Sequence, residues 1–414
     1  MPSYNKSRLA APRKSFLGIL ASVVFLISCA AVSPVSAQMR SDSGLGDQWR
    51  VNSIARLMAG LPPMHPAHLD IARTDSWKAH AAAMQAAWKK VNAERISAMA
   101  AWRDTAISNG KECPVGKALL YPFAGPDFFN AWWMFPGCET FVMFGLEHIG
   151  DVPNIEKMSK RSVDRLMNDV RAATSDFFDR NYFITENMTR QLHTAQLRGV
   201  VPLVMISMAV SGLDILRIVP NNIAPSGPRT SGKSLRALRG VTIEFRVPGS
   251  SVVRKVHYFS GDATDGGLTR YPEFLNFIRQ QAPATSFLKS ASYLLHSKEF
   301  SAVRDAILAV SSFLVQDDSG MPYGQLTARN WQVKLYGRYD VPIPPFQYAY
   351  QPALAKAYAE QKPDKLPFTF GYQFHDYRDE RSNVMVARGS AVEQRAGGDA
   401  NRGMSLRSSG KLDR

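Results

Sequence analysis

The first 37 residues divide into a basic section, an apolar section and a section of small residues. Four cations come first, an apolar stretch of about 14 residues from Phe16 to Cys29 follows, and Val35-Ser-Ala37 precedes Gln38. This length is typical of a secretory signal peptide and falls short of the roughly 20 apolar residues of a membrane-spanning helix. We therefore expect an exported protein, periplasmic or extracellular, with residues 1–37 as its leader.

A second cleavage site lies inside this leader. Leu26-Ile-Ser-Cys29 matches the lipobox of bacterial lipoproteins, in which the cysteine becomes a lipid-bearing N-terminus. Lipoprotein linkers usually turn polar after that cysteine, whereas Ala30-Ala-Val32 stays apolar. Cleavage after Ala37 is therefore favoured, and a lipid anchor at Cys29 is the alternative.

The cysteines agree with export. The chain has three, and Cys29 belongs to the leader in either scheme. Cys113 and Cys138 remain, and two cysteines in an oxidising compartment favour one disulfide, here closing a loop of about 25 residues. Two buried thiols are the alternative.

The charge of the chain narrows the classes of partner. Removing the four leader cations from the formal charge of +15 leaves a charge of +11 on the mature chain. This positive charge favours an anionic envelope component as the partner. The alternative is that the charge only keeps the protein soluble. The spacing of zinc fingers, basic zippers and RNA-binding strands is missing, so we expect no specific nucleic acid. No later segment has 18 uninterrupted apolar residues, so we expect no transmembrane span in the mature chain.

Hydrophobic periodicity predicts an α+β fold with a helical N-terminal part, an aromatic-rich centre and a small mixed or antiparallel sheet in the C-terminal half. Residues 241–247 and 252–259 alternate apolar and polar side chains around a Pro-Gly turn, which predicts a hairpin. Further strands are expected at 331–339, 368–372 and 383–387. Helices are expected, among other places, over 200–219, 286–296 and 299–314.

The expected domain organisation is a single globular unit over residues 38–388. A candidate internal boundary lies in the Pro-, Gly- and Ser-rich segment 220–234. Within this segment, residues 227–234 match the phosphate-loop pattern G-x-x-x-x-G-K-[ST]. That motif needs a buried strand directly before it, whereas here a proline-containing segment precedes it. A flexible basic loop is therefore favoured over a phosphate-binding site. Residues 389–414 carry few large apolar side chains, which predicts a disordered basic tail.

Nine aromatic residues fall between Tyr121 and Phe144. Tyr121, Trp132 and Trp133 are candidate ligand-binding residues, because aromatic faces stack on sugars and apolar ligands. The alternative is a dense aromatic core.

Candidate catalytic groups are Asp127, the adjacent Glu147 and His148, and the paired Asp317 and Asp318. A carboxylate beside a histidine or a second carboxylate can act as acid and base. The zinc-helix pattern H-E-x-x-H is missing, so the sequence predicts no metal site, and it identifies no cofactor. Turn-forming acids that only cap backbone amides are the alternative.

Several stretches together resemble a family of uncharacterised exported bacterial proteins. They include Leu120-Tyr-Pro-Phe-Ala-Gly-Pro-Asp-Phe-Phe129, Gly145-Leu-Glu-His-Ile-Gly-Asp-Val-Pro153, Leu288-Lys-Ser-Ala-Ser-Tyr-Leu-Leu-His296, Gln316-Asp-Asp-Ser-Gly-Met-Pro322 and Leu366-Pro-Phe-Thr-Phe-Gly-Tyr372. The resemblance spans most of residues 115–388. It implies one full-length globular unit and assigns no activity, cofactor or catalytic residue.

The sequence thus favours an exported envelope protein that binds a small-molecule ligand or an anionic partner. The alternative is a metal-assisted or acid–base hydrolase that uses the carboxylate and histidine cluster. The alternative requires these side chains to converge in one pocket.

The two cleavage schemes predict different mature proteins. We expect the intact mass of the exported protein to correspond to a chain that begins at Gln38. A mass that corresponds to a lipidated Cys29 would instead establish a membrane-tethered protein.

Overall fold

The computed structural model describes residues 43–107, 113, 116–183, 185–224, 227–229, 237–291, 293–372 and 382–389. These described residues belong to one compact unit. The expected leader and basic tail, apart from Gly389, lie outside the described residues, as does most of the phosphate-loop match at 227–234.

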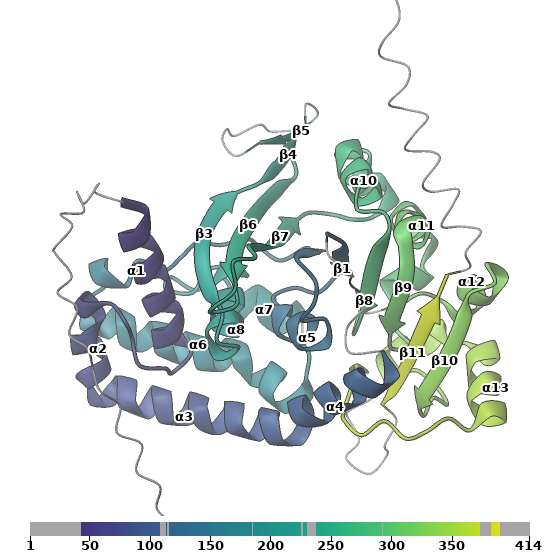
Figure 1. The fold of residues 1–414 in the computed structure, drawn as a ribbon, viewed down its shortest axis with the longest axis horizontal. Coiled ribbons are helices and arrows are strands. Elements are labelled where there is room, and N and C mark those ends of the chain that lie inside the picture. Colours follow the sequence, from purple (N-terminus) through teal and green to yellow (C-terminus); the bar gives the residue numbers. More distant parts are fainter. Residues whose placement is uncertain are drawn as a thin grey trace, which may run out of the picture. The chain divides into compact units, whose positions relative to one another are not determined.

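One nine-stranded sheet runs through the unit in the order β10-β11-β9-β8-β1-β2-β7-β6-β3 (Figure 1). Its five central strands are parallel: β9 (Ser311–Gln316), β8 (Ala284–Leu288), β1 (Ala118–Pro122), β2 (Thr140–Gly145) and β7 (Arg254–Ser260). Antiparallel strands flank them, with β11 (Asn383–Arg388) and β10 (Gln332–Gly337) at one edge and β6 (Arg239–Arg246) and β3 (Asp214–Pro220) at the other. The short strands β4 (Asn222–Ala224) and β5 (Gly227–Arg229) form a separate pair.

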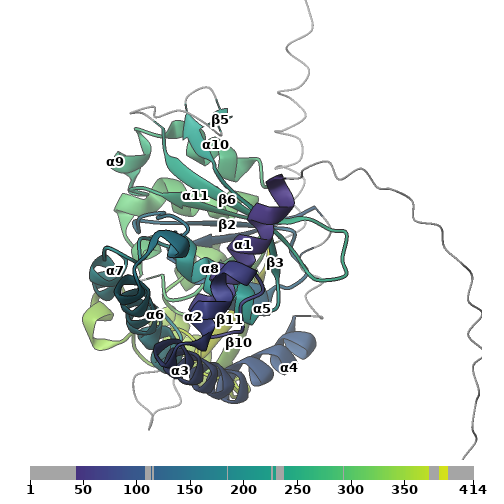
Figure 2. The ribbon, with the colours of Figure 1, turned by 90° about the vertical axis from the view of Figure 1, so that its left-hand side faces the viewer.

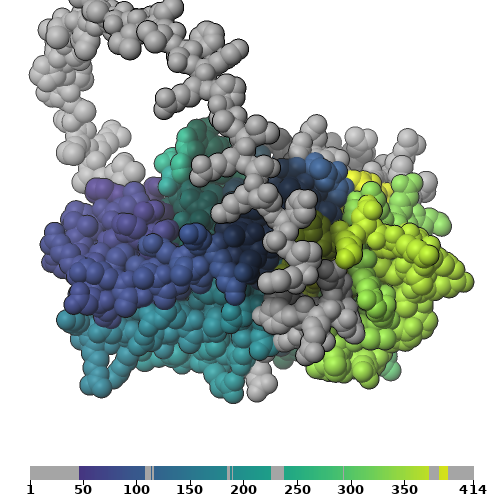
Figure 3. Space-filling view, turned by 90° about the horizontal axis from the view of Figure 1, so that it is seen from below, coloured from purple at the N-terminus to yellow at the C-terminus, as the bar shows by residue number. Residues whose placement is uncertain are grey.

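Helices cover both faces of the sheet, as the view turned by 90° shows (Figure 2). In the space-filling view from below, residues from the N-terminal part of the chain (purple and blue) form the left side of the visible face, and residues from the C-terminal part (yellow-green) form the right side (Figure 3). Along β1, Leu119 and Tyr121 point into one hydrophobic core while Ala118 and Leu120 point into a second, which is the alternation of a pleated strand buried on both faces. The first core contains residues of α1 (Ser43–Met58), α3 (Asp75–Val91), α4 (Ser97–Ala106), α5 (Phe128–Met134), α6 (Lys160–Arg180) and α8 (Val201–Val210). The second contains residues of α9 (Asp265–Leu268), α10 (Pro272–Arg279), α11 (Ser301–Val310) and α12 (Tyr323–Ala328).

Several further helical segments are ten residues long or shorter. Helix α2 (Leu69–Arg73) follows the 3-10 helix η1 (Pro66–His68), and η4 (Ile155–Lys157) precedes α6. Helix α7 (Thr185–Gln191) packs against α6. Helix α13 (Pro352–Gln361) shares a small core with β10 and β11. Among the helices of the described residues, none has the length and apolar character to cross a membrane.

Local capping explains where the long helices begin and end. The Thr74 hydroxyl accepts the Trp77 N–H at the start of α3, and the Ser159 hydroxyl accepts the Ser162 N–H at the start of α6. Helix α6 ends at Asn181, which has a left-handed backbone (φ 64°) and serves as its C-cap.

The expectation of a chain that mixes helices and strands is confirmed. The expected small sheet of the C-terminal half is not: the sheet has nine strands, and two of its central strands come from the aromatic-rich segment. The predicted hairpin is confirmed as β6 and β7. Because β3 and β6 pair directly with each other, the segment 220–234 connects two neighbouring strands of one sheet.

The helices expected over 286–296 and 299–314 are the main correction. The first region contains β8, and the second divides into α11 and β9. The segment 200–219 likewise divides into α8 and β3, with a turn at Gly212, whose φ is +69°. Strands buried on both faces are continuously apolar, so periodicity alone does not separate them from buried helices. The stretch 368–372 lies in no strand.

The expected disulfide is confirmed. Cys113 and Cys138 are bonded, with their Cα atoms 5.1 Å apart. The bond ties the chain just before β1 to the chain just before β2, so it secures the start of two neighbouring central strands.

Replacing both cysteines by alanine should lower the free energy of unfolding by about 3.5 kcal/mol, because a closed loop of 25 residues reduces the entropy of the unfolded chain. Urea unfolding of the double variant and of the oxidised wild type measures this difference. An unchanged urea midpoint would show that the bond contributes nothing to stability.

Candidate functional site

The carboxyl ends of the five parallel strands meet at one edge of the sheet. Ligands of open α/β sheets bind outside this edge. The loops that follow these strands carry most of the polar residues singled out from the sequence. They are 123–127 after β1, 146–148 after β2, 261–264 after β7, 289–290 after β8 and 317–319 after β9.

A buried ion pair lies at the centre of this edge. Lys289 Nζ donates a hydrogen bond to Asp127 Oδ2 at 3.1 Å, and the two side chains are 0% and 4% exposed. Asp127 also accepts the Tyr121 hydroxyl at 2.8 Å and the backbone N–H of Asn130, so it serves as the N-cap of α5. Lys289 makes a second hydrogen bond to the backbone carbonyl of Asn181. Burial lowers the pKa of Lys289, and the nearby Asp127 carboxylate opposes that shift.

Asp317 lies next to this pair along the sheet edge. Its carboxylate accepts the backbone N–H of Ser290 at 2.9 Å and the backbone N–H of Ser319 at 3.0 Å. An added Cβ at Gly371, which has φ +68°, would overlap this carboxylate, so the position requires glycine. Burial raises the pKa of Asp317, and the adjacent Asp318 carboxylate raises it further.

Asp318 holds other segments against the same loop. Its carboxylate accepts the Tyr293 hydroxyl at 2.6 Å and the side-chain amide of Asn383 at 2.8 Å. Its backbone carbonyl accepts the side-chain amide of Gln351 at 3.0 Å. Asp318 therefore links the end of β9 to the start of β11 and to the residue before α13.

The other two predicted catalytic residues lie outside this network. Glu147 accepts the Tyr258 hydroxyl at 3.2 Å, and burial raises its pKa. It borders the 123–127 loop, since a Cβ at Gly125 would lie 3.6 Å from Glu147 Cδ. His148 is exposed, and its Nδ1 accepts the backbone N–H of Gly150 at 3.0 Å. The structure therefore brings Asp127, Asp317 and Asp318 to one connected network, places Glu147 beside it and leaves His148 at the surface.

The predicted aromatic ligand-binding residues belong to the core. Tyr121 is 1% exposed and Trp132 is 8% exposed, and Trp133 is half-buried. The Trp132 ring packs against Phe141 and Phe245. These placements fit the core interpretation of the aromatic block, and the Tyr121 hydroxyl reaches the candidate site by donating a hydrogen bond to Asp127.

A small cavity of about 20 Å³ opens beside the ion pair. This volume is about that of one water molecule. Aromatic and apolar side chains line most of it, together with three polar residues that matter chemically: Asp127, Lys289 and Ser290. The aromatic side chains that line it are Tyr121, Phe123, Tyr182, Phe183 and Tyr372.

Backbone strain is concentrated at the same cavity. Phe123 has φ +57° and Ser290 has φ +53°, and each follows a central strand directly or within one residue. A left-handed backbone costs a non-glycine residue about 1–3 kcal/mol, and such strain gathers at functional sites. The Ser290 hydroxyl is buried and has no hydrogen-bond partner among the described residues.

Sequence reasoning missed Lys289 and Ser290 because residues 286–296 were expected to form a helix. The signal is present in the sequence: Ala284-Thr-Ser-Phe-Leu288 followed by Lys-Ser is a short apolar run that ends in polar residues. Reading this run as a buried strand would have placed Lys289 and Ser290 at a strand end, where sites occur.

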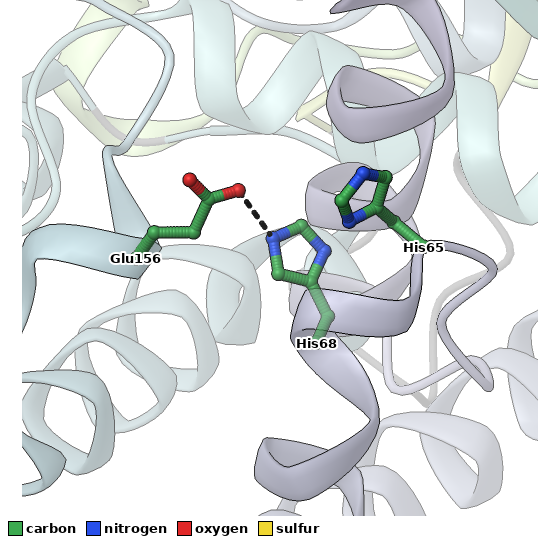
Figure 4. Close-up of side chains that lie close together, drawn as sticks. All are labelled: His65, His68 and Glu156. Carbon is green, nitrogen blue, oxygen red and sulfur yellow. Dashed lines mark hydrogen bonds and ion pairs between the residues drawn. The ribbon is translucent and has the colours of Figure 1, made fainter. Parts of the chain in front are cut away.

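Two larger surface grooves lie elsewhere. One of about 500 Å³ runs between α1 and β3, and one of about 1190 Å³ lies beside β10 and α13. Neither contains a residue of the ion-pair network. Among the described residues, one group can hold a metal ion, formed by His65, His68 and Glu156 (Figure 4). The sequence had predicted no metal site, and this group shares no residue with the cavity.

Comparison of the chain with protein-family models, curated proteins and solved structures finds no match. The geometry at the sheet edge is therefore the basis for assigning a function.

Replacing Asp317 by asparagine should remove part of the pH dependence of stability. The pKa of Asp317 is higher in the folded state than its ordinary value of 3.8, so above about pH 4 the folded state binds more protons than the unfolded state. The free energy of unfolding contributed by this group therefore falls as the pH rises through that window. Urea unfolding at a series of pH values above about 4 should give a less negative slope for Asp317→Asn than for the wild type. Asp305→Asn, at a side chain 57% exposed, is the control; equal slopes in all three proteins would contradict the assignment.

Proposed function

We propose that this protein is an exported binding protein for a small oxygen-bearing ligand, held at the carboxyl ends of β1 and β8. The observation that carries the proposal is the Ser290 hydroxyl. It is buried, has no partner among the described residues, sits on strained backbone and lines the same cavity as the Lys289 ammonium group. A buried polar group without a partner costs about 1–3 kcal/mol, and a ligand would recover this free energy.

Lys289 supports the proposal because its ammonium group has more N–H donors than the two protein acceptors that it contacts. An ammonium group has three N–H donors. Two of them reach Asp127 and the carbonyl of Asn181, which leaves one for a ligand oxygen. The Ser290 hydroxyl and this N–H can together hold one oxygen atom in the cavity.

The size and lining of the cavity indicate the class of ligand. A volume of about 20 Å³ admits one oxygen-bearing group of the size of a water molecule and nothing larger, so the remainder of the ligand would lie against the aromatic side chains that line the cavity. The formal charge of +11 expected for the mature chain favours an anion. A small carboxylate, either a monocarboxylic acid or a sugar acid, meets both conditions.

The hydrolase alternative has less support. It called on five groups in one pocket, and His148 lies at the surface, away from the network of Asp127, Asp317 and Asp318. These three acids already accept hydrogen bonds from the protein, and Asp127 is also held in the ion pair with Lys289.

Two substitutions of Ser290 separate binding from folding. Ser290→Ala should weaken carboxylate binding about tenfold, which corresponds to the loss of one hydrogen bond of about 1–1.5 kcal/mol. Ser290→Gly should weaken binding as much and yet raise the melting temperature, because glycine adopts φ +53° without strain. Calorimetric titration with acetate, lactate and glucuronate measures binding, and thermal unfolding measures stability.

Ser175→Ala is the matched control, since this serine is exposed on α6 and its hydroxyl bonds only within the helix. It should leave both quantities unchanged. If Ser290→Gly binds these carboxylates as well as the wild type does, or if the wild type binds none of them, the proposal is wrong.

A further inference from the structure

His65, His68 and Glu156 come together from two segments on the α1 side of the fold (Figure 4). His65 is the N-cap of η1 and His68 is its last residue, and a 3-10 helix has three residues per turn, so the two rings lie on the same side. Their centroids are 5.3 Å apart. Glu156 belongs to η4 and faces them from the other segment.

The distances among the three side chains suit a metal ion. One ligand atom from each lies within 4.8 Å of the other two. Metal–ligand bonds of 2.0–2.2 Å in a tetrahedral site place neighbouring ligand atoms about 3.3 Å apart. His68 Nε2 and Glu156 Oε1 already lie 3.3 Å apart. The ligand atom of His65 lies within 4.8 Å of both, and its side chain is half-buried at the start of η1.

Ser53 orients His68 from the opposite side of the ring. Its Oγ accepts the backbone N–H groups of Met64 at 3.1 Å and His65 at 3.0 Å, and it lies 2.9 Å from His68 Nδ1. With both lone pairs occupied, the Ser53 hydroxyl donates to Nδ1, and we assign the ring proton to Nε2, which faces Glu156.

A metal ion on His68 Nε2 would replace that ring proton. Nδ1 would then carry the proton and donate it to Ser53 Oγ, since a hydroxyl group acts as donor or acceptor. The partner outside the metal site is therefore in place for both states. In the metal-bound state Ser53 Oγ would face three N–H donors but has only two lone pairs to accept them. This shortage lowers the affinity of the site for the metal ion, so the site suits an exchangeable ion better than a permanently bound one.

Arg50 competes with a metal ion for the carboxylate of Glu156. Its guanidinium forms an ion pair with Glu156 Oε2, on the carboxylate whose other oxygen faces His68. Glu156 is 28% exposed in its side chain, so a metal ion can reach it from solvent. A metal ion and the Arg50 guanidinium would repel each other, and binding therefore requires Arg50 to move aside.

We propose that His65, His68 and Glu156 form a site for an exchangeable divalent transition metal ion, with Zn²⁺ as the best fit. Two imidazoles and one carboxylate are a common ligand set for Zn²⁺, and the fourth position is left for water. The site is independent of the proposed carboxylate site, because the two share no residue.

Calorimetric titration of ZnCl₂ into the chelator-treated protein, with any purification tag removed, tests the proposal. We expect one Zn²⁺ per chain. His65→Gln should weaken binding at least tenfold, because it removes one of the three ligands. The metal-free variant should melt within a few degrees of the wild type, since the ring makes only a cap hydrogen bond with Ala67 and ring contacts with Trp49 and His68. Glu156→Gln should weaken binding similarly. Arg50→Met should strengthen it several-fold, because the competing cation is removed.

His148→Gln is the matched control, since the exposed His148 lies near His193 and offers a rival pair of imidazoles. It should leave the Zn²⁺ affinity unchanged. Co²⁺ bound in place of Zn²⁺ should show the intense visible absorption of tetrahedral coordination in the wild type and lose it in His65→Gln. If His148→Gln alone removes binding, if His65→Gln binds as well as the wild type does, or if no stoichiometric binding occurs, the proposal is overturned. His65→Gln keeps the test valid even where Glu156→Gln destabilises the fold.

Discussion

The buried ion pair of Lys289 and Asp127 connects three segments that are distant in the sequence. Lys289 follows β8, Tyr121 near the end of β1 and Asp127 at the start of α5 belong to one segment, and Asn181 is the C-cap of α6. Removing one partner of such a pair costs about 3–5 kcal/mol, because the other charge is left buried and unpaired. The pair therefore sets the positions of the loops after β1 and β8 relative to each other. The cavity between these loops exists because both are held in place.

Strained backbone and a buried hydroxyl group without a hydrogen-bond partner among the described residues occur together at this edge of the sheet. Both features lower the stability of the fold, and their combination is typical of a functional site. Phe123 and Ser290 both have left-handed backbones, and the Ser290 hydroxyl has no partner within the described part of the chain. The three nearby acids, in contrast, all accept hydrogen bonds. Natural proteins retain such costs where a ligand or a reaction requires them. The group of His65, His68 and Glu156 differs in kind. His68 and Glu156 already share a hydrogen bond, and a metal ion would have to displace Arg50 and a ring proton.

Sequence reasoning was most reliable where the signal was local. The β6–β7 hairpin followed from alternation and a Pro-Gly turn, and the disulfide followed from the number of cysteines and the leader. It failed at β8 and β9, where continuous burial removes the alternation on which a strand prediction depends. The same failure hid Lys289 and Ser290. Asp127, Asp317 and Asp318 were selected for their chemical type, while His148 was selected beside Glu147 although its ring lies at the surface.

By itself the sequence determined the features that depend on neighbouring residues: the turn between β6 and β7, and the two cysteines left for pairing. Only the tertiary structure decided which polar groups meet. Parallel strands joined by crossovers bring residues 162 positions apart, Asp127 and Lys289, into one hydrogen bond, and a loop and a short helix bring His68 and Glu156 together across 88 positions. Such contacts depend on strand order and on layer packing, which arise from the burial of both faces of the sheet at once and have no local pattern in the chain.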